Sequence, residues 1–388
     1  MKVPGVQIYF PEEDKKWILD KINESLSTGQ LTLGKYVKQF EQEFASYIGT
    51  KYAVAVSSGT SAIEIAMRIF FANPDLSGEV KGKEVIVPTN TFFATPAAVL
   101  HAGGIVKFVD TERETFAINV DGLKEAITPN TAGVIVVHIG GIISPNIYEI
   151  KEICKERGLF LFEDGAHSHG SALDNIKAGA FGDAGSFSFF PTKVITSGEG
   201  GMIVTNSETI RDEALIYRDQ GKMDPAANLH GRLGYNWRLS EPHAIIGVTQ
   251  LRRLDEFIEA RNRIAKIYDK GLEGIRGISV VKVPENSVCN YYKYIAMLEP
   301  GIKRSELKKE LRAEFEVGLT GEVYELPCHI QPIFKSLCGC KGGSPHSDFP
   351  IAEDVCSRHI CLPIFVKMTD EQAEYVVDSI SKVISSKD

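Results

Sequence analysis

Short runs of apolar residues that do not alternate with polar ones are the feature that most restricts the fold of this chain. We expect strands at residues 52–56, 84–88, 105–110, 133–138, 159–162, 184–189 and 202–205. Helical stretches separate many of these runs, at residues 61–70, 97–103, 119–126 and 147–158. Strands without alternation are typical of a parallel sheet covered on both faces. The sequence therefore predicts an α/β fold that binds ligands beyond the carboxyl ends of its strands.

The pattern changes after residue 238. A long helical stretch at 241–272 leads to strands at 278–281 and 291–297. The closing helix starts at Thr369 with Gln372 three positions later, which is the pattern of a capping box. A chain of 388 residues is long enough for two domains. We expect a large α/β domain over residues 1–250 and a smaller α+β domain over 251–388, to which the N-terminal segment contributes.

Charge and hydropathy exclude several classes of function. The formal net charge is −8 and no long basic run occurs, so nucleic acid is not an expected partner. No apolar stretch approaches the length of a membrane span, and the first residues lack the apolar region of a secretory signal. We therefore expect a cytoplasmic protein with no membrane partner.

The cysteines raise the question of a metal site. There are seven, and five of them lie between Cys328 and Cys361, with histidines nearby. An odd number without a signal peptide argues against a disulfide framework. Cys338 and Cys340 have a C-x-C spacing, whereas structural zinc sites use paired C-x-x-C motifs. We expect unpaired thiols and no metal.

One lysine stands between two apolar runs. Residues 186–201 read SFSFFPTKVITSGEGG, so aromatic residues precede Lys193 and a glycine-rich turn follows it. A lysine in a dry environment has a lowered pKa, which makes its amine a nucleophile for a carbonyl or an aldehyde cofactor. Taken alone, Lys193 is better explained as a surface residue of a loop.

Four further features follow one another along the chain. The turn Ser58-Gly59-Thr60 before a helix offers backbone N–H groups and hydroxyls to a phosphate, although an ordinary helix cap has the same residues. Phe92 and Asp164 then come at or just beyond strand ends, and Ser188 precedes Lys193. Pyridoxal 5'-phosphate (PLP) needs this set: an amine for its aldehyde, a carboxylate for its ring nitrogen, a flat apolar wall and a phosphate site.

With these residues in place, the chain resembles the DegT/DnrJ/StrS family of sugar aminotransferases, a branch of the fold-type I PLP enzymes. The matching stretches include AVSSGTSAIEIA, FEDGAHSHG, SFSFFPTKVITSGEGG, GYNWRLSE and LPCHIQPIF. They extend from about residue 27 to 354. The resemblance implies a mostly parallel central sheet with helices on both faces and a smaller α+β C-terminal domain.

The resemblance also implies a role for each matching residue. Lys193 would form a Schiff base with the cofactor and later move a proton, and Asp164 would pair with the pyridinium. Phe92 would stack on the ring. The phosphate would be held by Ser58, Gly59, Thr60 and Ser188, and by Asn236 of the neighbouring subunit, so that a homodimer has shared active sites. A lysine at position 193 argues against the dehydratase members of the family.

Two positions depart from the usual family pattern. His167 stands where many members have glutamine, and we expect it to bind the phenolic oxygen of the cofactor; the alternative is a histidine with a purely structural role. The segment VHIGGIISP contains Gly140-Gly141, which we expect to remove side chains from the substrate pocket. Candidate substrate contacts are His329, Gln331 and Thr32, whose alternative explanation is ordinary loop polarity.

These observations favour transamination: L-glutamate or L-glutamine gives its amino group to a keto-sugar, most simply a nucleotide-linked one, in amino-sugar, polysaccharide or natural-product biosynthesis. A keto-cyclitol or a nucleotide-free oxo-sugar acid is the alternative acceptor. A PLP-fold regulator without turnover, or another PLP reaction such as that of a lyase or desulfurase, also stays open, because a fold alone does not fix a reaction.

Overall fold

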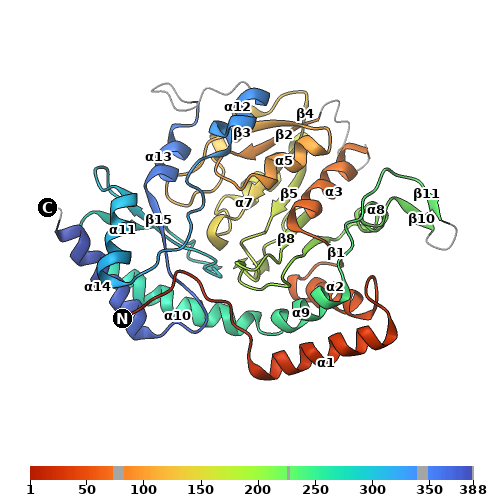
Figure 1. Cartoon of the computed structure of the whole chain (residues 1–388). Helices are drawn as coiled ribbons and strands as arrows, with labels where there is room; N and C mark the ends of the chain where they lie inside the picture. The colour runs from red at the N-terminus through yellow and green to blue at the C-terminus, as the bar shows by residue number, and fades with distance from the viewer. Residues whose placement is uncertain (73–82, 225–227, 339–347, 387–388) are drawn as a thin grey trace.

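A computed structural model describes residues 1–72, 83–224, 228–338 and 348–386. In this part of the chain a seven-stranded sheet lies at the centre, in the order β1-β9-β8-β5-β4-β2-β3 (Figure 1). Its strands are β1 (Tyr52–Val56), β2 (Glu84–Pro88), β3 (Ile105–Val109), β4 (Thr131–Val137), β5 (Phe160–Asp164), β8 (Ala184–Ser188) and β9 (Gly201–Thr205). The pairs from β8 to β3 are parallel, and β9 runs antiparallel to both of its neighbours. The prediction of a mostly parallel sheet is confirmed.

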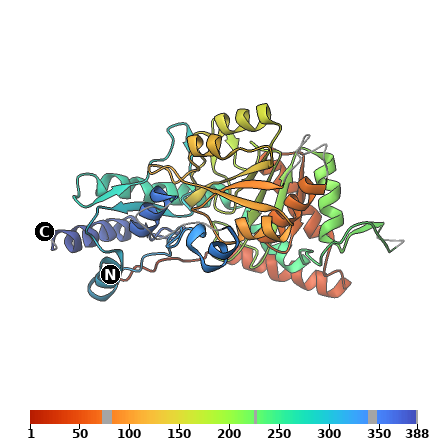
Figure 2. The same cartoon turned by 90° about the horizontal axis from the view of Figure 1, so that it is seen from above.

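Helices cover both faces of this sheet, as the view from above shows (Figure 2). They include α3 (Gly59–Ala72), α5 (Ala94–His101), α6 (Val120–Ala126), α7 (Ile147–Arg157) and α8 (Glu208–Arg218). Every residue of β4 and β5 is buried. A strand covered on both faces has no side that meets water, which is why these segments are apolar without alternation.

Four more helices lie along the lower edge of the molecule in Figure 1: α1 (Glu12–Thr28), α2 (Lys35–Ile48), α9 (Glu241–Leu251) and α10 (Leu254–Leu272). Glu241 joins the first pair to the second, because its carboxylate accepts hydrogen bonds from the N–H groups of Gly34, Tyr36 and Val37 at 2.9–3.0 Å. The helical stretch expected over 241–272 is present as two helices with a short turn between them. The turn is Arg252-Arg253; Arg253, with φ/ψ near −98° and −4°, caps the start of α10, and its guanidinium binds Asp14 of α1.

A second layer of structure follows α10. A sheet in the order β12-β14-β15 (Ile278–Val280, Tyr294–Leu298, His359–Leu362) packs against α10 and the closing helix α14 (Asp370–Ser385). The predicted capping box of α14 is present at Thr369 and Gln372. Four further helical segments lie between β14 and the closing helix in the described residues: α11 (Arg304–Phe315), η2 (Cys328–Ile330), α12 (Pro332–Cys338) and α13 (Pro350–Arg358). Of these, η2, α12 and α13 contribute to the core of the large sheet.

Two contacts join segments that are far apart in the sequence. Val3 forms a parallel bridge with Val317, so the first residues lie against the second layer. A short sheet of β13 (Ser287–Val288), β6 (Ala172–Leu173) and β7 (Ile176–Lys177) joins that layer to the large sheet. The domain boundary at residues 250 and 251 stays a prediction.

The strands β10 (Lys222–Asp224) and β11 (Leu229–His230) form a hairpin that projects from the body at the right of Figure 1. The short helix η1 (Ile139–Gly141) follows β4. Within the described ranges, no helix is both long enough and apolar enough to cross a lipid bilayer.

Candidate active site

A cavity of about 340 Å³ opens at the carboxyl ends of β5 and β8. Eight of the nine residues that we expected to contact a cofactor line its wall: Ser58, Gly59, Thr60, Phe92, Asp164, His167, Ser188 and Lys193. They come from five separate segments of the chain. The fold thus places predicted anion-binding, carboxylate and amine groups around a single space.

One end of the cavity is suited to a phosphate. The side chains of Ser58 and Ser61 cap the start of α3 reciprocally: the N–H of Ser61 donates to Ser58 Oγ at 3.1 Å, and the N–H of Ser58 donates to Ser61 Oγ at 3.0 Å. A Cβ added to Gly59 would lie 2.8 Å from the Cβ of Ser188, so the end of β8 approaches the turn closely only because residue 59 is glycine. Hydroxyls, backbone N–H groups and the positive end of the α3 dipole meet there.

The carboxylate of Asp164 is buried and held in a fixed orientation. Its Oδ2 accepts a hydrogen bond from Thr95 Oγ1 at 2.7 Å, and its Oδ1 accepts one from the N–H of Ala166 at 3.1 Å. Thr95 is oriented in turn by Thr91, 2.8 Å away. A carboxylate fixed by two donors at a cavity wall is suited to bind a protonated ring nitrogen.

His167 has both ring nitrogens engaged. The N–H of Gly140 donates to Nδ1 at 3.3 Å, so the ring proton is on Nε2, which faces Tyr324 Oη at 3.1 Å. Burial, with the nearby charges of Lys193 and Lys293, lowers the pKa of His167 well below its usual value. The ring is therefore a neutral donor at physiological pH, and in this structure its proton points to Tyr324.

The expectation for Gly140 and Gly141 is wrong. Neither residue lines the cavity, and a Cβ at these positions would meet Ile295 at 2.7 Å and Asn290 at 2.0 Å instead. Both have positive φ, near 66° and 100°. The pair therefore serves close packing and the orientation of His167, and it does not enlarge the pocket.

Lys193 extends along the cavity beside Tyr292, with Nζ 4.8 Å from the ring centroid. Its pKa is lowered to about 8, chiefly because protein surrounds the ammonium, while Asp164 opposes the shift and Lys293 adds to it. At pH 7 about a tenth of the amine is consequently uncharged, far more than for an ordinary lysine, and the uncharged form is the nucleophile for an aldehyde.

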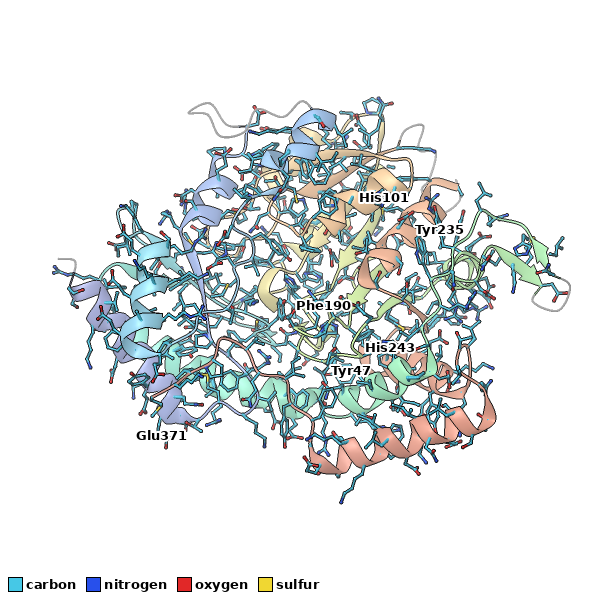
Figure 3. The ribbon with its side chains drawn as sticks, in the orientation of Figure 1. Tyr47, His101, Phe190, Tyr235, His243 and Glu371 are labelled. Atoms are coloured by element: carbon cyan, nitrogen blue, oxygen red, sulfur yellow. The ribbon has the colours of Figure 1, made fainter. Side chains whose placement is uncertain are left out.

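Aromatic residues form the mouth of the cavity. Phe92 is 56% exposed, and its ring centroid lies 5.6 Å from that of Tyr324. Phe190 is 46% exposed and lies near the centre of the molecule in Figure 3. Large exposed rings at a cavity mouth are suited to stack on a planar ligand or to contact another protein surface.

Some predicted residues lie elsewhere. Asn236 is exposed and is not on the cavity wall. His329 is fully buried between Thr89 Oγ1 at 2.7 Å and Glu353 at 3.0 Å, so the prediction that it contacts a substrate is wrong. Thr32 and Gln331 are also away from this wall, and a substrate contact by either stays a prediction.

The cysteines in the described ranges do not form a metal site with neighbouring side chains. Cys154, Cys289, Cys328, Cys356 and Cys361 are buried and free, and no group of three or more potential ligands lies together there. Cys340, His346 and the side chain of Cys338 fall outside the described residues.

Sequence reasoning missed Thr95, Tyr292 and Tyr324. The two tyrosines come from the second layer, more than one hundred residues after Asp164, and no local pattern marks them. Thr95 lies at the start of α5, four residues after Thr91, and the two hydroxyls form a hydrogen bond. This spacing could not be linked to the site from the sequence, because only the structure shows that Thr95 contacts Asp164.

A family-level comparison matches residues 12–381 to the DegT/DnrJ/EryC1/StrS aminotransferase family. The chain belongs to this family. As a member it is a PLP-dependent aminotransferase of the sugar aminotransferase group, so the resemblance inferred from its motifs is confirmed. Its phosphate turn, Asp164 and Lys193 fit PLP by the chemistry described above.

The sequences of several relatives align with nearly the whole length of this aminotransferase. It is 34% identical to the GDP-perosamine synthase of Escherichia coli O157:H7, over 99% of both chains. It is 30% identical to the dTDP-3-amino-3,4,6-trideoxy-alpha-D-glucose transaminase of Micromonospora megalomicea subsp. nigra, over 96% of both chains. Among solved structures, NtdA of Bacillus subtilis with bound cofactor PMP matches with a TM-score of 0.88 and 27% identity, over 99% of this chain and 85% of that one.

Proposed function

We propose that this aminotransferase moves an amino group from L-glutamate or L-glutamine to a nucleotide-linked keto-sugar. The observation that supports transamination best is the cavity in which Lys193, with a pKa near 8, faces the Asp164 carboxylate and the phosphate turn. The nucleotide is suggested by relatives, whose names refer to GDP- and dTDP-linked sugars.

Each residue has a separable task in this reaction. PLP, when bound, supplies an aldehyde for the amino group and a ring that withdraws electrons. Ser58, Gly59, Thr60 and Ser188 would hold its phosphate, and Asp164 its ring nitrogen. Lys193 would take a proton from the substrate carbon and return it to the cofactor side, a role for which a pKa near the working pH is suited.

A single cavity has to admit both substrates in turn. The donor leaves as a keto acid before the keto-sugar enters, which predicts ping-pong kinetics. Acceptors without a nucleotide, such as a keto-cyclitol or an oxo-sugar acid, are the alternative. A regulatory protein without turnover is disfavoured because Lys193 and Asp164 are both present and face one cavity.

We also propose a homodimer with shared active sites. Asn236 lies outside its own cavity and near the base of the β10–β11 hairpin, which projects from the body. Apolar side chains are exposed along this segment: Met223, Leu229 and Leu233 are 56%, 57% and 92% exposed. Together with Phe92 and Phe190 at the cavity mouth, they provide apolar area for a second copy of the chain.

The test is the visible absorbance of the PLP-loaded protein before and after excess L-glutamate or L-glutamine. We expect the donor to convert the cofactor band to that of pyridoxamine phosphate, and a keto-sugar to restore it. Lys193→Ala should bind PLP without the wild-type band and should not respond, whereas Lys282→Ala, at an exposed lysine, should behave as wild type. A wild-type band that neither donor changes would contradict transamination.

A further inference from the structure

A second cavity, of about 790 Å³, adjoins the first. The two share His167, Thr192, Tyr292 and Tyr324 on their walls. From these residues the second cavity extends between the N-terminal segment and the residues around Thr320, and none of the residues of the phosphate turn lines it. A substrate that reacts at Lys193 therefore has space to extend into it.

Lys293 lines this second cavity without a carboxylate partner. Its Nζ donates a hydrogen bond to Thr320 Oγ1 at 2.9 Å, and in the described part of the chain no acidic side chain lies within ion-pair distance. The acidic residue Glu322 lies nearby, but it pairs with Lys308 at 2.6 Å. A largely buried ammonium bound only to a hydroxyl is costly, because the hydroxyl does not neutralise its charge.

The position of Lys293 relative to Lys193 limits what it can bind. The Nζ atom of Lys193 lies 4.8 Å from the centroid of the Tyr292 ring, and the Nζ atom of Lys293 lies 5.2 Å from the same centroid. Their separation cannot exceed the sum of these distances. An amino acid whose amine reacts at Lys193 can span this interval with a short side chain that ends in a charged group.

We propose that Lys293 binds the side-chain carboxylate of the amino donor and so selects a dicarboxylic amino acid, such as glutamate, over its amide. The inference rests on the proposed transamination. A carboxylate neutralises the ammonium of Lys293 and accepts a charge-assisted hydrogen bond from it. The amide of glutamine carries no charge, so it would leave the ammonium of Lys293 without a carboxylate partner. A site built to bind a charged or hydrogen-bonding group rejects an analogue that lacks this group.

The experiment measures the half-reaction of the PLP-loaded protein with L-glutamate, L-glutamine and L-alanine, by absorbance. For Lys293→Met we expect kcat/KM for glutamate to fall roughly 10- to 100-fold, mainly through KM, with changes of about two-fold or less for glutamine and alanine. Lys293→Arg should retain part of the preference for glutamate. Lys282→Met, at an exposed position, is the matched control.

A binding measurement completes the test without turnover. Glutarate has two carboxylates and no amine, and calorimetry should show it binding to wild type about 10-fold more tightly than to Lys293→Met. Equal losses for all three donors, or an unchanged preference for glutamate, would overturn the assignment of Lys293 while leaving transamination intact. A wild-type protein that reacts with no donor would overturn the proposed function and this inference with it.

Discussion

At the scale of single residues, Lys193 shows how position sets reactivity. Its ammonium is surrounded by protein, which lowers its pKa to about 8, while the charge of Asp164 raises it and that of Lys293 lowers it further. A lysine at the surface keeps a pKa above 10 and is almost entirely charged at neutral pH. By removing water from this amine, the fold gives Lys193 the pKa that its proposed role as nucleophile requires.

This shift predicts the pH dependence of cofactor uptake. Only the neutral amine attacks the aldehyde of PLP, and the neutral fraction of Lys193 rises as pH increases through about 8. In stopped-flow measurements on the apoprotein, we expect the rate of PLP uptake to rise with a midpoint near pH 8 and to level off above about pH 9.

The same measurement on Asp164→Asn provides the internal control. Because the Asp164 charge raises the pKa of Lys193, its removal should move the midpoint to lower pH. A rate that continues to rise toward pH 10 in wild type would indicate an amine with an ordinary pKa, in contradiction to the burial seen here.

At the scale of elements, the phosphate turn depends on how closely β8 approaches the start of α3. The turn has no room for a side chain at residue 59, since an added Cβ would lie 2.8 Å from the Cβ of Ser188. Gly201 at the start of β9 is similarly close, with its Cβ position 2.2 Å from the carbonyl oxygen of Ser58. Three elements thus meet at the site, and small residues make this possible.

Gly59→Ala should consequently weaken PLP binding. Overpacking of this kind costs about 1–3 kcal/mol, which corresponds to roughly 5- to 150-fold in affinity. Fluorescence titration of the apoprotein with PLP measures the change. Ala62→Gly, in the same helix, should lower the unfolding temperature without this loss of affinity. If Gly59→Ala binds PLP with wild-type affinity, the turn accommodates the added methyl group and the prediction is wrong.

At the scale of the whole molecule, the proposed dimer makes a prediction about complementation. Lys193→Ala and Asn236→Ala should each be strongly impaired alone. If Asn236 serves the cofactor of its partner, a mixed dimer contains one site with both native residues and one site with neither. An equimolar mixture refolded together should then regain about a quarter of wild-type activity, since half of the dimers are mixed. No recovery would show that Asn236 serves its own subunit or no site at all.

The class of fold and most of the residues that line the cavity could be predicted from the sequence. Apolar runs such as 133–138 are visible because a strand buried on both faces excludes polar residues, and Ser58, Asp164 and Lys193 are visible because they stand where such runs end. These patterns are local in the sequence, so they can be recognised without knowing which other segments pack against them.

Only the tertiary structure decided the other contacts. The sequence motif predicted His329 as a substrate contact, but its side chain is buried between Thr89 and Glu353. The turn between α9 and α10 lies where Arg253 binds Asp14 of the distant helix α1. Tyr292 and Lys293 reach the site from the second layer. Whether a side chain faces a cavity or a neighbouring residue depends on how distant segments of the chain pack. The local sequence around a residue does not specify that packing.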